Sequence, residues 1–212
     1  MKKLSQTVSI FFAIGLLFAS SSCFAIPTLK YGGSIFYDST GVFPADLNIS
    51  GVILPGDYTE LSYSPDLATS SVILSADFLS ASSDGSHTTG LFGTTPANDL
   101  LISDAFGTNT LLTGNVSTLL LTGREGMNLG ILAGTINITG GLLAGDFGGV
   151  GSLFSINFNL DTMFGPDMFN SNFFGITNGS ITKVEVPEPM PLALLSIGLL
   201  GMTMSRKFYR RG

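Results

Sequence analysis

Apolar and polar residues alternate with a period of two along much of the chain between Lys30 and Val186. Because successive side chains of a strand point to opposite faces of its sheet, this alternation is typical of a strand with one buried face. The clearest expected strand is Ser152 to Asp161, and Thr135 to Thr139 repeats its pattern. The apolar residues of these two strands predict an inward face that comprises Phe154, Ile156, Phe158, Leu160, Ile136 and Ile138.

Gly, Pro, Asn and Asp interrupt the alternation at short intervals, and no long stretch has the 3.6-residue period of a helix. Short strands at this spacing predict an all-β domain, either an antiparallel β-sandwich or a barrel-like domain. The segment Thr162 to Gly175 is rich in Phe and Met, and we expect it to plug one end of the fold, with a ligand-binding groove as the alternative. The remaining expected strands are 33–37, 47–54, 71–78, 100–106, 116–122, 129–133 and 180–186.

The charge of this domain argues against one class of partner. From Ile26 to Glu185 the chain has three basic and fourteen acidic residues, which gives a formal net charge of −11. Binding to nucleic acid requires clustered cations that neutralise phosphates. We therefore expect no nucleic-acid partner and a solvated, acidic, secreted surface.

Residues with catalytic or metal-binding chemistry are few. His87 is the single histidine, and its neighbours from Ser82 to Thr89 have the composition of an exposed loop, without the local frame of a serine hydrolase. Asp99 and Asp104, beside Asn98, are the nearest candidates for calcium ligands, although no calcium-loop motif surrounds them. We therefore predict no catalytic residue, no metal site and no cofactor.

The N-terminal 25 residues are typical of a secretory signal peptide. Lys2 and Lys3 precede a twelve-residue apolar run, which is too short to span a bilayer core of about 30 Å. Small residues follow, and we expect cleavage after Ala25 by signal peptidase once the secretion translocon has engaged the chain. Acylation of Cys23, the single cysteine, and a permanent N-terminal anchor are the alternatives.

The C-terminal segment from Val186 to Gly212 has three parts. Pro187, Glu188 and Pro189 cannot form a regular helix or a central strand, so this tripeptide must be extended. The sixteen residues from Met190 to Ser205 carry no charge and would form about 24 Å of helix, a short transmembrane span. The cations that follow predict a cytoplasmic end for this helix, and they are Arg206, Lys207, Arg210 and Arg211.

This arrangement resembles the PEP-CTERM sorting signal of exopolysaccharide-producing Gram-negative bacteria. The resemblance covers about 27 residues and implies recognition of Pro187, Glu188 and Pro189 by an exosortase, a membrane-embedded cysteine transpeptidase. It also implies that the helix is a transient anchor in the cytoplasmic membrane. Cleavage near the tripeptide would then release the protein or attach it to an extracellular partner.

The sequence thus predicts a signal peptide (1–25), a secreted β-rich domain (26–185) and a sorting signal (186–212). We expect an exported surface or extracellular matrix protein that is non-enzymatic and associated with exopolysaccharide. The alternative is a secreted module that binds carbohydrate or calcium, or a hydrolase that uses two carboxylates.

Overall fold

A computed structural model describes residues 27–184, with gaps at 44, 57, 59–60, 63–66 and 97. These residues form nine strands and one short 3-10 helix, η1 (Met168–Asn170). The strands are β1 (Thr28–Tyr37), β2 (Leu47–Ile53), β3 (Ser71–Ser83), β4 (His87–Gly93), β5 (Leu100–Ser103), β6 (Thr110–Arg124), β7 (Gly130–Gly140), β8 (Leu153–Asp161) and β9 (Phe173–Lys183).

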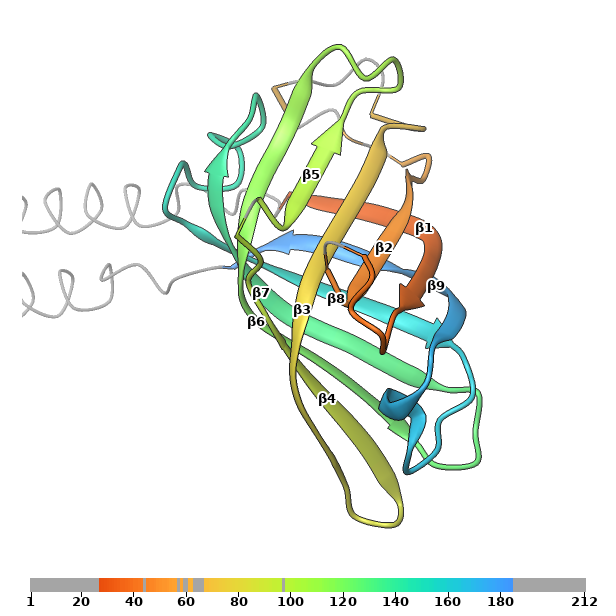
Figure 1. The fold of residues 1–212 in the computed structure, drawn as a ribbon. Helices are drawn as coiled ribbons and strands as arrows, with labels where there is room; N and C mark the ends of the chain where they lie inside the picture. Colours follow the sequence, from red (N-terminus) through yellow and green to blue (C-terminus); the bar gives the residue numbers. More distant parts are fainter. Residues whose placement is uncertain are drawn as a thin grey trace, which may run out of the picture.

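The strands close into one antiparallel barrel (Figure 1). Around the ring the order is β2-β1-β9-β8-β7-β6-β4-β3, and the pairing of β2 with β3 completes the circle. β4 and β5 share one of the eight positions, because both lie between β3 and β6, one after the other. The all-β prediction is therefore confirmed, and of the two expected architectures the structure has the barrel.

The pairing register defines two ends of the barrel. The exit end holds the first and last described residues, because Thr28 pairs with Thr182 and Lys183 N donates a hydrogen bond to Pro27 O (3.3 Å). The β2–β3, β5–β6 and β7–β8 connections lie at this end. The hairpin end holds the β1–β2, β3–β4, β6–β7 and β8–β9 connections.

Apolar side chains fill the interior of the barrel, as expected for eight strand positions, which leave room for side chains or one small ligand. The expected inward residues of β7 and β8 are all at most 2% exposed, and their polar neighbours face outward. A cluster of five rings (Tyr37, Phe78, Phe92, Phe169 and Phe173) packs at the hairpin end, with centroids 5.1 to 6.1 Å apart. We call this set the aromatic plug.

Two pairs of facing glycines make room for large rings inside the barrel. Gly123 of β6 faces Gly130 of β7, and a Cβ atom on either residue would overlap the ring of Phe164. Gly33 and Gly51 also face each other, and a Cβ on Gly51 would lie 2.7 Å from the Tyr31 ring. The rings occupy the space that side chains at these four positions would otherwise fill. Part of the high glycine content therefore serves packing.

The strand boundaries differ from the prediction in several places, and β1, β6 and β9 begin earlier than expected, at Thr28, Thr110 and Phe173. The segment from His87 onward is strand β4, although its Thr and Gly content indicated a loop. The two short strands expected between 129 and 139 are one strand, β7, because Gly134 packs against the backbone of β6 and does not break it. β5 ends at Ser103, where the turn that contains Gly107 begins.

Candidate functional site

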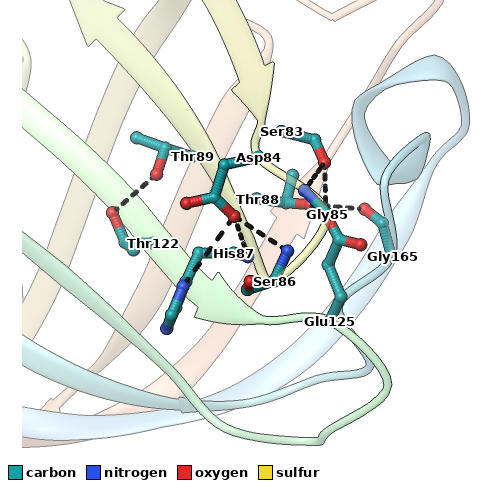
Figure 2. A network of polar contacts seen from close by, with 10 residues as sticks. All are labelled: Ser83, Asp84, Gly85, Ser86, His87, Thr88, Thr89, Thr122, Glu125 and Gly165. Atoms are coloured by element: carbon teal, nitrogen blue, oxygen red, sulfur yellow. Dashed lines mark hydrogen bonds and ion pairs between the residues drawn. The ribbon is translucent and has the colours of Figure 1, made fainter.

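Polar side chains gather at the β3–β4 hairpin, where the sequence placed its only histidine (Figure 2). The Asp84 carboxylate accepts hydrogen bonds from the backbone N–H groups of Ser86 (2.8 Å) and His87 (2.7 Å). Gly85 has a φ of +81°, a left-handed conformation that favours glycine. The hydrogen bonds from the two N–H groups, that of His87 first, lower the pKa of Asp84.

Glu125 ties this hairpin to two other chain segments. Its Oε1 atom accepts a hydrogen bond from the Ser83 hydroxyl, and the Thr88 hydroxyl lies 2.9 Å from the same atom. The Thr88 hydroxyl is also 2.9 Å from the carbonyl oxygen of Gly165, in the β8–β9 connection. Thr88 is fully buried, so the contact is a structural link among β4, the β6–β7 turn and the β8–β9 connection.

This geometry does not assemble a serine–histidine–aspartate triad. A triad requires the histidine to bond the nucleophile and the carboxylate to orient the histidine. Here Ser83 donates to Glu125, while His87 Nδ1 lies 4.0 Å from Asp84 and both side chains are more than half exposed. The polar cluster therefore holds the hairpin in shape, and His87 is exposed as predicted, although in a strand.

Asp99, the first calcium candidate, closes the break between β4 and β5. The residue is 1% exposed, and its carboxylate accepts hydrogen bonds from Thr95 N (2.7 Å), the Thr95 hydroxyl (2.7 Å) and Val116 N (2.5 Å). Its own carbonyl accepts a hydrogen bond from Ser75 N of β3 (2.8 Å). Asp99 therefore links β3 to β6 across the point where the shared strand position is interrupted.

Asp104, the second candidate, closes the β5–β6 turn. Its carboxylate accepts hydrogen bonds from Thr108 N (2.7 Å), the Thr108 hydroxyl (2.7 Å) and the Asn109 side-chain amide (2.6 Å). These hydrogen bonds, led by that of the Thr108 hydroxyl, lower the pKa of Asp104 to about 2. No cluster of three or more His, Cys, Asp or Glu residues suited to a metal occurs within the described ranges.

Two buried hydroxyls lack a hydrogen-bond partner in the described part of the molecule. They belong to Tyr31 of β1 and Thr177 of β9, both fully buried in the interior. Burial raises the pKa of Tyr31 well above its usual value, so the phenol stays protonated at neutral pH. The Tyr31 ring stacks on Phe158 at a centroid distance of 4.6 Å, which holds it within the apolar core.

The segment from Thr162 to Gly175 follows its prediction in part. Phe164, Met168 and Phe169 are buried, and Phe173 packs against the core, so these residues do plug the hairpin end. Met163 and Phe174 are instead 68% and 65% exposed. The two exposed side chains stand next to buried neighbours in the chain, as the alternation of an extended backbone requires.

The sequence-predicted processing sites lie outside the described residues. They are Cys23, Ala25, Pro187, Glu188, Pro189, Arg206, Lys207, Arg210 and Arg211. The described part of the chain contains no helix with the length and apolar character that crossing a bilayer requires. Sequence reasoning missed that the first and last strands of the domain pair and so share the exit end. The available signal was the extended pattern near Thr28 and near Lys183, but the pairing of two strands cannot be read from either strand alone.

Comparison of the chain with protein-family models, with curated proteins and with solved structures gave no match, so the fold and the site are described from this chain alone.

Proposed function

We propose that this chain is an exported surface or extracellular matrix protein that an exosortase sorts through its C-terminal segment. The observation that carries the proposal is the sequence order of the Pro187 to Pro189 tripeptide, the uncharged run from Met190 to Ser205 and the basic residues after it. The signal-peptide pattern before Ile26 supplies the export route that this order requires. The partners are then the secretion translocon, signal peptidase, the exosortase and, in the matrix, exopolysaccharide.

The position of the exit end supports this proposal. The last described residue, Val184, lies beside the start of β1, so both flanking segments attach to one end of the barrel (Figure 1). Three residue steps separate Val184 from Pro187, which span at most about 10 Å. A membrane-bound enzyme would therefore act directly beneath a folded domain whose remaining surface points away from the bilayer.

The hydrogen bonds of the barrel support a non-enzymatic role. The carboxylates of Asp84 and Asp104 accept backbone N–H groups of their own connections, and that of Asp99 accepts Thr95 N of its connection and Val116 N of β6. Glu125 likewise holds two hydroxyls that link separate segments. These acids shape loops, whereas a two-carboxylate hydrolase needs a pair that faces a common substrate position.

The proposal is tested by changing Glu188 to Ala in a host that has its exosortase, with Glu185→Ala as the matched control. We expect the Glu188 variant to remain full length and membrane-bound, because the tripeptide loses the one charge that it offers for recognition. The control should be cut and released as the unchanged protein is. Normal processing and release of the Glu188 variant would overturn the sorting proposal.

One feature of the outer surface favours a second candidate function, carbohydrate binding. Six outward residues of β8 and β9 form three facing pairs of uncharged polar side chains: Ser155 with Thr182, Asn157 with Ser180, and Asn159 with Asn178. The three asparagines are exposed, and their side chains make no hydrogen bond to another described residue. Their amide groups are therefore available to donate to and accept from sugar hydroxyls.

A glycan array read with and without calcium tests this candidate. The triple change of Asn157, Asn159 and Asn178 to Ala should abolish saturable binding. The control changes the outward pair Thr89 and Thr122 of β4 and β6, whose hydroxyls lie 3.2 Å apart, and should leave binding intact. Absence of saturable binding by the unchanged protein would exclude this candidate and leave the sorting proposal untouched.

A further inference from the structure

We propose that, while the chain is anchored, the β7–β8 connection at the exit end rests on the lipid surface and inserts apolar side chains at the boundary between headgroups and acyl chains. The inference rests on the proposed function, because it requires the run from Met190 to Ser205 to lie in the bilayer. It adds an interaction surface of the folded domain itself. The partner is a zwitterionic lipid surface.

The chain leaves the described structure directly beside this connection. Val184 N donates a hydrogen bond to the carbonyl of Leu153, the first residue of β8 (3.3 Å). Six residue steps separate Val184 from Met190, which span at most about 20 Å when fully extended. The exit end therefore cannot lie farther than this from the membrane while the apolar run is inserted.

The connection between β7 and β8 has apolar residues on both of its sides, one packed against the core and one facing outward. Leu143 and Phe147 are fully buried and fix it to the core of the barrel. Leu142, Val150 and Leu153 are 55%, 71% and 42% exposed. Because the buried residues hold the backbone in place, the exposed ones are presented to the outside without a cost of ordering the loop on contact.

The charges of the connection itself and of the neighbouring end of β9 suit a neutral interface. Asp146 is the only acidic residue of the connection, and its carboxylate accepts hydrogen bonds from Ser62 N (3.0 Å) and the Ser62 hydroxyl (2.6 Å). Lys183 lies beside Gly148, since a Cβ on that glycine would be 3.6 Å from the lysine Cε. A lysine at this position keeps its ammonium group at the headgroups while its apolar stem lies along the surface. Exposed apolar side chains next to such a cation are the composition expected at a lipid interface.

The test uses the absence of tryptophan from the sequence. Val150→Trp places a single indole in the proposed contact, and Ser86→Trp places one at the tip of the β3–β4 hairpin, at the opposite end of the barrel. Both full-length variants are reconstituted in phosphatidylcholine vesicles, with or without dibromination of the acyl chains near the headgroups. Bromine quenches indole fluorescence only at close range.

We expect about a twofold loss of emission for Val150→Trp and no loss for Ser86→Trp, because an interfacial contact buries side chains roughly 5–10 Å into this boundary. Flotation of the vesicles reports separately whether the C-terminal run anchors the chain. If the protein floats with the vesicles and Val150→Trp is not quenched, the lipid contact is overturned while the anchor stands. If the protein does not float, the anchoring on which both proposals depend is overturned.

Discussion

Two sets of apolar residues at opposite ends of this barrel, the aromatic plug and the exposed residues of the exit end, are placed in opposite ways. At the hairpin end, Phe169 and its neighbours in the aromatic plug turn inward and pack ring against ring. At the exit end, Leu142, Val150 and Phe106 are 55%, 71% and 83% exposed. Exposed apolar side chains also occur at the hairpin end, where Val42 and Met163 are 80% and 68% exposed, so what sets that end apart is the packed ring cluster.

The difference shows that apolar content does not by itself locate the core of this protein. The β8–β9 connection closes over the barrel because η1 directs Met168 and Phe169 inward. The β7–β8 connection is also fixed to the core, but by other residues, which leaves Leu142 and Val150 free to face outward. Changes in the buried aromatic plug should therefore have large effects on stability, and changes at Leu142, Val150 or Phe106 should have small ones.

The largest contrast should come from removing one ring at each end. Phe169→Ala should lower the free energy of unfolding by about 3–5 kcal/mol, because it leaves a cavity among four rings. Phe106→Ala should change it by less than about 0.5 kcal/mol, since that side chain already contacts water. Urea denaturation of both variants measures the contrast. Equal losses would show that the hairpin end is not a packed plug.

A smaller effect is expected from adding one methyl group. Gly123→Ala should destabilise the protein by roughly 1–3 kcal/mol, because the new Cβ would overlap the Phe164 ring and force it to move. Gly145→Ala, in the β7–β8 connection, meets no atom within 4 Å of its Cβ and should be close to neutral. The measurement is again the midpoint of urea unfolding. A neutral Gly123 variant would mean that Phe164 has free space beside it.

One carboxylate at each end should contribute to stability in the same way as the pH falls, so the contrast between the ends does not extend to these two groups. Asp38 at the hairpin end and Asp104 at the exit end each have a pKa lowered to about 2, mainly by hydrogen bonds from the hydroxyls of Thr40 and Thr108. A carboxyl pKa below its unfolded value of about 3.9 stabilises the fold above that pH. The contribution is lost as the pH falls from about 4 to about 2.

Asp38→Asn and Asp104→Asn should therefore each lose less stability than the unchanged protein over that range. Thermal unfolding recorded at closely spaced pH values checks this, with Asp167→Asn as the control, since that exposed carboxylate accepts one hydrogen bond from the described residues, that of the Asn170 side chain. If one variant flattens the acid profile and the other does not, the two carboxylates do not perform the same role. The contrast between the ends would then extend to their polar groups.

The sequence predicted which residues of a strand face inward better than it predicted how the strands pair. Alternation along β8 identified its inward residues correctly, because period two follows directly from the geometry of a strand. The strand β4 was missed, since Thr and Gly are common in loops and only the pairing with β3 and β6 gives the segment its extended form. The choice between sandwich and barrel depends on the pairing of β1 with β9, which no local pattern contains.

The candidate site was predictable only as a set of residue types. Asp99 and Asp104 stood out as acidic residues near each other, but their roles depend on Val116 N and Thr108, whose positions follow from the fold. The link from Ser83 through Glu125 to Thr88 joins residues 42 and 37 positions apart, so a local motif could not reveal it. The predicted signal peptide and sorting signal differ from this site, because each is defined by the order of residues along the chain and can be recognised without knowledge of the fold.

The seam between the first and last strands fixes the order of events when this protein folds. Ten residue pairs join β1 to β9, from Thr28 with Thr182 to Tyr37 with Phe173. Contacts between such distant parts of a chain carry a large loop-closure entropy and slow the folding reaction. Until the residues through Lys183 are present, β1 and β8 remain as open sheet edges, which invite pairing with other chains. Closure of the barrel by the pairing of β1 with β9 is therefore a late step. It brings the two ends of the domain together only after the residues of every strand are present.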